Sequence, residues 1–166
     1  MRHIISILLQ NEAGALARVA GMFASRGYNI ESLTVAPTHE PTVSRLTLVS
    51  IGSDAVIEQI IQQTRKLVDV VEITDLSARD HLETEMLMLK VQADAASART
   101  VIDCVRRHRG QMLDETDDTR MIQLAGTGAE VDRFIAEIGK LATILELVRS
   151  GVAALERGKR VLALPA

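Results

Sequence analysis

The residues whose types and spacing could bind a small molecule lie between positions 10 and 30. The chain enters an amphipathic segment through residues 10–14 (QNEAG) and leaves it through residues 27–29 (GYN). A helix N-terminus presents unpaired N–H groups and a partial positive charge, which attract a carboxylate without any basic side chain. Gly14 has no Cβ, so a ligand can approach the backbone closely, and Asn11 offers a donor and an acceptor. These groups suit a ligand with one carboxylate and one ammonium group, which describes a free amino acid.

The two asparagines, Asn11 and Asn29, also have an ordinary structural explanation. Asn is a common capping residue before a helix, and it is favoured next to Gly where a helix ends. The two residues flank one predicted helix, so both positions suit that role. Spacing alone favours this structural explanation over a ligand site.

The elements that would hold these groups follow from the hydrophobic pattern. Residues 14–27 have apolar side chains at the spacing of one helical face, namely Leu16, Val19, Ala20, Phe23 and Ala24. Gly27 ends this helix, and a second apolar stripe after Ser53 or Asp54 predicts another. Apolar or alternating runs predict strands at residues 3–9, 29–36, 43–51 and 70–76. The order is therefore β-α-β-β-α-β.

The same order recurs in the second half of the chain. We expect strands at 85–92, 111–116, 120–125 and 143–149, and helices at 96–109 and 129–140. Gly27 and Gly110 hold the same place in the two halves, between the first helix and the second strand. This repeat predicts an α+β fold of two tandem βαββαβ units with the ferredoxin-like architecture. The expected boundaries are a first domain at 1–77, a polar linker at 78–84, a second domain at 85–158 and a tail at 159–166.

The first strand is apolar on both of its faces. Its apolar residues are Ile4, Ile5, Ile7, Leu8 and Leu9. Helices that cross over with the usual right hand cover only one face of such a sheet. A strand that is apolar on both faces is typically buried on both faces. We therefore expect an oligomer, with the other face or the edge of the sheet buried against another copy, within the chain or between chains.

Composition excludes several classes of protein. The chain has 19 basic and 22 acidic residues and a net charge of −3, so the balance does not favour nucleic acid or an anionic membrane as a partner. No apolar run reaches the roughly 18 residues of a membrane-spanning helix, and the apolar N-terminus resembles a strand more than a signal peptide. The single cysteine, Cys104, excludes an internal disulfide. These features predict a cytoplasmic protein.

An enzymatic function finds little support. The four histidines, at 3, 39, 81 and 108, are scattered, and no catalytic or phosphate-binding motif is present. We expect Cys104 to be a half-buried structural thiol. Residues 114–118 (DETDD) could hold a divalent cation, but a solvated hairpin tip is the better interpretation. No catalytic residue and no metal ligand is therefore predicted.

An RNA-binding module shares the predicted architecture and needs its own test. Such modules stack bases on aromatic side chains that a sheet exposes. This chain has two Phe, one Tyr and no Trp, and Phe23 and Phe134 lie on the apolar stripes of predicted helices. The basic cluster at 106–110 (RRHRG) ends a helix, where cations offset the dipole. The sequence argues against RNA binding.

Several long strings resemble one protein family, the small subunits of acetolactate synthase. The string NEAGALARVAGMFASRGYNIESLTVAP at residues 11–37 resembles their N-terminal ACT domain, an amino-acid-binding module. The likeness continues through residues 66–76, 109–116, 123–127 and 149–158, and thus covers nearly the whole chain. It implies an N-terminal ACT domain followed by an ACT-like C-terminal domain.

The resemblance also implies a function. Family members are regulatory and bind no cofactor themselves; thiamine diphosphate, Mg²⁺ and FAD belong to a separate large subunit, which makes acetolactate (EC 2.2.1.6) for branched-chain amino acids. The small subunit raises that activity and confers feedback inhibition by valine. A rival interpretation is an ACT-type sensor that serves a different enzyme.

The resemblance further implies where the effector binds. In such families it lies between two ACT domains paired side by side in a homodimer. The positions of this chain that match the effector-binding segments are Asn11, Gly14, Ala15, Leu16, Asn29 and Ile30. Asn11 of one chain and Asn29 of the other would then contact the same ligand.

Overall fold

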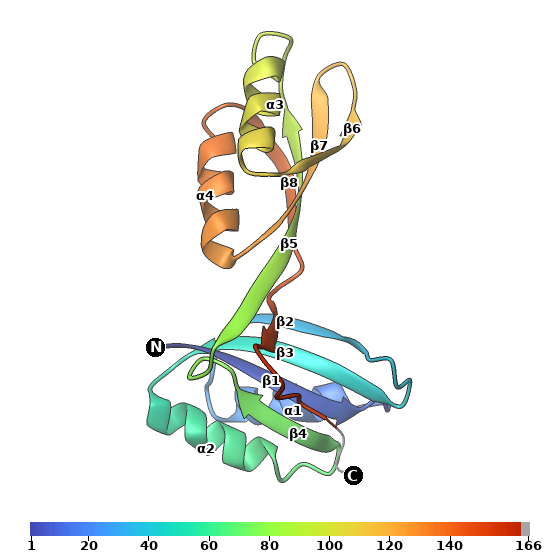
Figure 1. Ribbon diagram of the computed structural model, residues 1–166, viewed down its shortest axis with the longest axis vertical. Coiled ribbons are helices and arrows are strands. Elements are labelled where there is room, and N and C mark those ends of the chain that lie inside the picture. The colour runs from blue at the N-terminus through green and yellow to red at the C-terminus, as the bar shows by residue number, and fades with distance from the viewer. Residues whose placement is uncertain (164–166) are drawn as a thin grey trace. The chain divides into compact units, whose positions relative to one another are not determined.

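The computed structural model describes residues 1–163, which divide into two compact units (Figure 1). The first unit comprises residues 1–82 together with the C-terminal segment that begins at Val152, and the second comprises residues 83–151. None of the helices in this described part is long and apolar enough to span a bilayer.

The first unit has the predicted order of elements. Its strands and helices are β1 (Arg2–Gln10), α1 (Ala15–Ser25), β2 (Ile30–Pro37), β3 (Val43–Ile51), α2 (Asp54–Thr64) and β4 (Val70–Asp75). The strands form an antiparallel sheet in the order β2-β3-β1-β4, which makes β2 and β4 its edges. The ACT fold expected for this half is thereby confirmed.

Alternation along the strands builds the main core of this unit. Ile5 and Ile7 of β1 face Leu48 and Leu46 of β3, and all four side chains are fully buried. Both helices pack on this face of the sheet, with Phe23 of α1 at 0% exposure. A fully buried side chain of this size contributes about 1.5–3 kcal/mol of hydrophobic stabilisation.

The opposite face of the sheet, which carries Ile4 and Val49, is covered in part by the same chain. Val152 and Ala154 form a second buried cluster with Ile4, Val49 and Leu76. Arg45 from β3 donates a hydrogen bond from Nη2 to the carbonyl oxygen of Ala154, at 3.0 Å. The sequence predicted that another copy, within the chain or between chains, covers one face or the edge of this sheet. Part of this face is covered instead by the segment that follows the second βαββαβ repeat and returns to the first unit.

The second unit repeats the topology. Its elements are β5 (His81–Gln92), α3 (Ala98–Arg107), β6 (Gln111–Glu115), β7 (Thr119–Gly126), α4 (Gly128–Ile138) and β8 (Thr143–Arg149), with sheet order β6-β7-β5-β8. Phe134 and Cys104 are both at 0% exposure in its core, so the thiol is fully buried and not half-buried as expected. Thr127 caps α4 in a capping box with Glu130.

The domain boundaries differ from those that the sequence suggested. Residues 78–84 are not a linker throughout, since β5 already begins at His81. Polar residues can form a strand where both of its faces are accessible to water, and His81 to Thr84 are exposed or half-exposed. A further strand, β9 (Ala153–Glu156), pairs with β5. It lies in the segment from Val152 that belongs to the first unit, so 85–158 is not one unit. Of the predicted tail, residues 164–166 lie outside the described residues.

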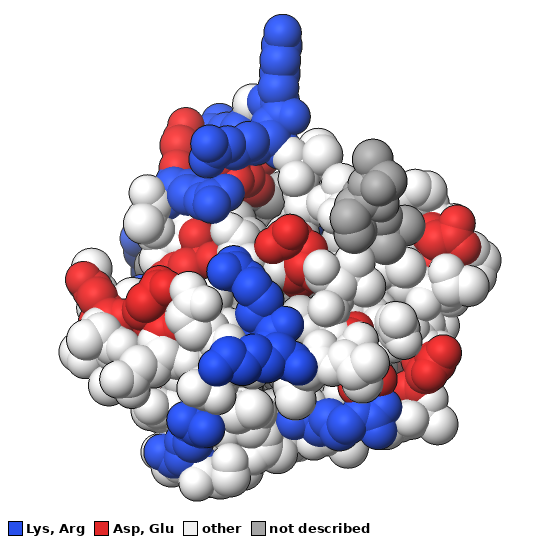
Figure 2. Space-filling model, turned by 90° about the horizontal axis from the view of Figure 1, so that it is seen from below, with Lys and Arg blue, Asp and Glu red and all other residues white. Residues whose placement is uncertain are grey.

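Charges of both signs are interspersed on the face that Figure 2 shows, without a large patch of either. The near balance of 19 basic and 22 acidic residues is consistent with that view. A face of this kind gives no electrostatic attraction for the regular charge of a nucleic-acid backbone.

A candidate ligand site at the start of the first helix

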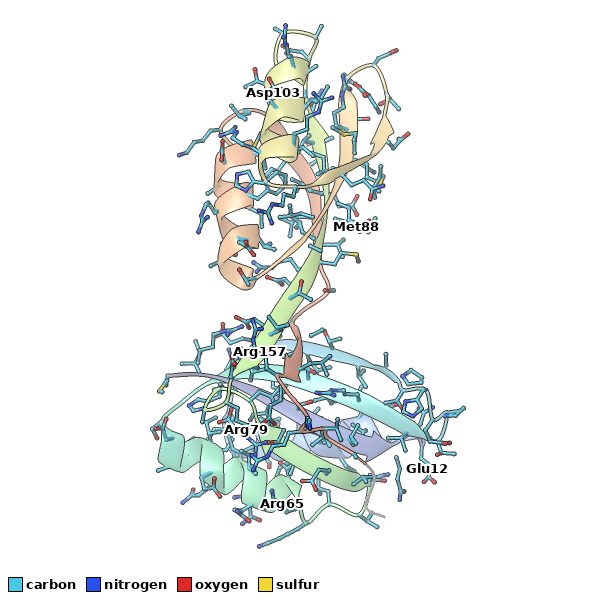
Figure 3. The ribbon with its side chains drawn as sticks, viewed as in Figure 1. Glu12, Arg65, Arg79, Met88, Asp103 and Arg157 are labelled. Carbon is cyan, nitrogen blue, oxygen red and sulfur yellow. The ribbon has the colours of Figure 1, made fainter. Side chains whose placement is uncertain are left out.

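The loop that joins β1 to α1 is held by its neighbours on both sides. The backbone N–H of Gln10 donates to the carbonyl oxygen of Asp69, and that of Asn11 donates to Thr42, both at 2.8 Å. The side-chain Nδ2 of Asn11 donates to the carbonyl oxygen of Pro41 at 2.9 Å. Asn11 therefore does not cap the helix, and its side-chain oxygen has no partner in the described part of the chain. Figure 3 marks this loop by Glu12.

Gly14 stands at the N-cap of α1 in a left-handed conformation, with φ of +86°. L-residues with a Cβ rarely adopt that conformation. A Cβ built on Gly14 would lie only 2.8 Å from Nη1 of Arg18. The backbone angle therefore favours glycine here, and a larger residue would also displace the guanidinium beside it.

Arg18 and Asp69 form a bidentate ion pair beneath this turn. Nη2 of Arg18 lies 2.6 Å from Oδ1 of Asp69, and Nε lies 2.5 Å from Oδ2. The Asp69 side chain is 3% exposed, and its backbone also accepts from Gln10. The pair thus connects the first turn of α1 to the segment between α2 and β4. Sequence reasoning missed both residues: Arg18 lies one turn after Gly14, but nothing local signals Asp69.

The start of α1 has free capacity to bind an anion. No side chain caps it, and its first turn contains no acidic residue. The N–H of Ala15 is bonded to Glu12, whereas those of Leu16 and Ala17 belong to the first turn, where no intrahelical acceptor exists. The side chain of Ala15 is buried, so only its backbone faces the turn, while Leu16 is 37% exposed. Such an end suits a carboxylate.

Asn29 and Ile30 lie at the other end of the sheet. Asn29 is exposed, and its Nδ2 contacts only Oε1 of Glu31, at 3.4 Å, while its carbonyl oxygen accepts from Ser50. Ile30 pairs with Ser50, whereas Gln10 pairs with Val43. Seven residues of strand separate those partners, which is about 23 Å. Within one chain the predicted residues therefore form two groups and not one site.

The ion pair predicts a pH dependence for the loop. The hydrogen bonds from Arg18 are the main cause that holds the pKa of Asp69 below its ordinary value of 3.8. The stabilisation is thus fully present above that value and is lost as the pH falls through the lowered pKa. We expect hydrogen-exchange protection of residues 10–18 to persist at pH 5 and to fall in more acidic solution. Asp69→Asn should reduce it already at pH 7, while Asp103→Asn, an exposed carboxylate on α3, should not.

Comparison with known proteins places these features in context. Family models described as the AHAS small subunit-like ACT domain and the small subunit of acetolactate synthase match residues 5–72 and 84–158. The acetolactate synthase isozyme 3 small subunit of Escherichia coli (strain K12) is 47% identical over 162 residues, covering 98% of this chain and 99% of that protein. The acetolactate synthase small subunit of Haemophilus influenzae is 46% identical over 160 residues, covering 96% and 98%. A crystal structure of the acetolactate synthase small subunit from Thermotoga maritima superposes with a TM-score of 0.88 at 33% identity, covering 96% of this chain and 99% of that one.

Proposed function

The chain belongs to the family of acetolactate synthase small subunits, and on that premise we propose that it regulates the catalytic large subunit in branched-chain amino-acid biosynthesis. The chain raises the activity of that subunit and makes it sensitive to valine, while thiamine diphosphate, Mg²⁺ and FAD bind to the large subunit. The observation that carries this proposal is the uncapped start of α1, where the guanidinium of Arg18 lies against Gly14.

The valine site is formed between two copies of the first unit. The edge strand β2 has a neighbour on only one side of the described sheet, and an edge strand is a template for pairing. β2 runs in the same direction as β1, because both are antiparallel to β3. Antiparallel pairing of two β2 strands therefore brings Asn29 of one copy towards residues 11–14 of the other. This arrangement joins the two groups of residues that a single chain keeps apart.

Each part of valine then has a chemically suitable neighbour. The carboxylate binds the N–H groups of Leu16 and Ala17 at the start of α1. The ammonium group donates to the free side-chain oxygen of Asn11 or Asn29. The isopropyl group contacts the exposed part of Leu16 and the half-exposed Ile30 of the second copy. One methylene more, as in leucine or isoleucine, costs about 1–3 kcal/mol of binding free energy when a small pocket rejects it.

Regulation follows if valine binds one arrangement of the subunits more tightly than another. A ligand shifts a conformational equilibrium only by its difference in affinity for the two states. The coupling free energy that allosteric proteins typically transmit is about 1–3 kcal/mol. Co-purification with the thiamine-dependent large subunit, and acetolactate formation with and without valine, test this function directly. Copurification with an unrelated enzyme instead would support a sensor of another pathway.

Asn29→Ala should weaken binding of valine without unfolding the chain. The lost bond to a charged group corresponds to about 1.5–3 kcal/mol, or about 10- to 100-fold in the dissociation constant. The fold should survive, because the side chain contacts only Glu31 and is exposed. Isothermal titration of the full chain measures the effect. Gln59→Ala, which removes an exposed amide from α2, is the control and should bind valine normally. Equal affinities in the two variants would remove Asn29 from the site.

A further inference from the structure

The second unit brings together three side chains that can act as metal ligands. Cys104 lies on α3, His108 is the C-cap residue that ends α3 about one turn later, and Glu137 lies on α4. Their donor atoms, a thiol sulfur, an imidazole nitrogen and a carboxylate oxygen, all lie within 4.8 Å of one another. Within the described residues no other group of three such side chains meets this condition, and the acidic residues 114–118 do not. The sequence predicted no metal ligand, and Glu137 is 29 positions from His108 along the chain.

We propose that Cys104, His108 and Glu137 bind a divalent transition-metal ion, and that Zn²⁺ fits them best. A thiolate selects Zn²⁺ over the hard ions Mg²⁺ and Ca²⁺, and imidazole and carboxylate complete its preferred set of ligands. Three protein ligands leave a fourth tetrahedral position for water. This site lies in the second unit and does not depend on the valine site of the first.

The geometry requires only small side-chain movements to bind the ion. Zn–S and Zn–N bonds of about 2.3 and 2.0–2.1 Å place tetrahedral donors about 3.3–3.6 Å apart. Nε2 of His108 already lies 2.7 Å from Oε2 of Glu137, so these two atoms must separate slightly while the sulfur approaches. The side chains of His108 and Glu137 are 14% and 32% exposed, which gives the ion and its water a path from solvent.

The surrounding residues orient the ligands. Nη1 of Arg107 lies 2.6 Å from Oε1 of Glu137, so it holds the carboxylate oxygen that faces away from His108 and leaves Oε2 for the ion. The imidazole ring of His108 lies against Phe134, with ring centroids 5.3 Å apart. Such contacts around the ligands fix their orientation in metalloproteins.

A reactive cysteine is a poorer explanation of the cluster. Nucleophilic and redox-active thiols have a lowered pKa and are accessible. The side chain of Cys104 is fully buried and not accessible. Without a metal ion, His108 pairs with Glu137, and the thiol of Cys104 also interacts with that carboxylate. A metal ion gives all three a common partner and ties α3 to α4.

Titration of the full chain with Co²⁺, a spectroscopic substitute for Zn²⁺, tests the site. A thiolate ligand produces an intense sulfur-to-cobalt absorption in the near ultraviolet, which Zn²⁺ should abolish by displacement. We expect one equivalent to bind, and thermal unfolding to shift to a higher temperature with Zn²⁺. Cys104→Ser should abolish the absorption, and Glu137→Gln and His108→Gln should weaken binding at least about 100-fold.

Asp103→Asn is the matched control for Glu137→Gln. Asp103, labelled on α3 in Figure 3, is exposed and adjacent in sequence to Cys104, so its substitution makes the same change in charge without removing a ligand. It should bind Co²⁺ like the unmodified chain. If Cys104→Ser fails to fold, the other two variants still decide the outcome. The proposal is overturned if the absorption is absent, if it persists in Cys104→Ser, or if all the variants bind alike.

Discussion

Replacing Gly14 with aspartate should abolish inhibition by valine while the activation of the large subunit survives. The new side chain places a carboxylate at the end of α1 that is proposed to bind the carboxylate of valine. It also forces a residue with a Cβ to a φ of +86° and pushes against Arg18, at 2.8 Å. Both effects disfavour binding of valine. Allosteric coupling typically changes the affinity of a second site about 5- to 150-fold, and we expect no such effect of valine in this variant. Acetolactate formation at increasing valine concentration measures this.

Gly14→Ala separates crowding from charge, and Gly158→Ala is its control. Gly158 has almost the same φ, +85°, but a Cβ there would meet nothing within 4 Å. If the guanidinium beside Gly14 matters, Gly14→Ala should weaken inhibition and Gly158→Ala should not. The same loss in both variants would attribute the effect to backbone strain in general.

A mixture of two variants that respond poorly to valine tests whether the site lies between chains. In a two-fold dimer of Gly14→Asp with Asn29→Ala, one site contains both substitutions and the other contains neither. Co-expressed variants should therefore recover part of the inhibition by valine that each has lost alone. If the mixed dimer forms and recovers none, the ligand does not bridge the two copies.

Local patterns in the sequence were enough to predict the elements of both βαββαβ repeats. The apolar stripe that ends with Phe23 and Ala24, and the alternation along residues 43–51, correspond to α1 and β3. These predictions succeeded because periodicity and turn chemistry act over a few neighbouring residues.

The contacts that the sequence did not predict join residues that are distant along the chain. Asp69 meets Arg18 across 51 positions, and Glu137 meets His108 across 29. The return of Ala154 to the first sheet was missed for the same reason, and because β9 has only four residues. Short apolar segments such as this one are ambiguous until their partners are known.

Ala154→Asp should destabilise the first unit more than any surface substitution in the chain. Ala154 is 5% exposed, and it lies in the apolar cluster with Ile4, Val49 and Leu76. A carboxylate there loses its hydration without a basic partner in that cluster, so we expect a loss of about 2–4 kcal/mol in the free energy of unfolding. The guanidinium of Arg45 bonds to the carbonyl oxygen of Ala154. If it turns to pair with the new carboxylate, the loss in the free energy of unfolding will lie at the lower end of that range.

Ala153→Asp provides the control, because it adds the same charge on the opposite side of the same strand. Ala153 is exposed, and its substitution should change the free energy of unfolding by no more than about 0.5 kcal/mol. Denaturant unfolding of both variants, followed by hydrogen exchange in β1 and in β5, would locate the loss. Destabilisation confined to the first unit is the expected result, because the cluster belongs to that unit. Equal stability of the two variants would mean that residues 152–154 do not cover the sheet in solution, and the apolar face of β1 would then need another copy of the chain to bury it.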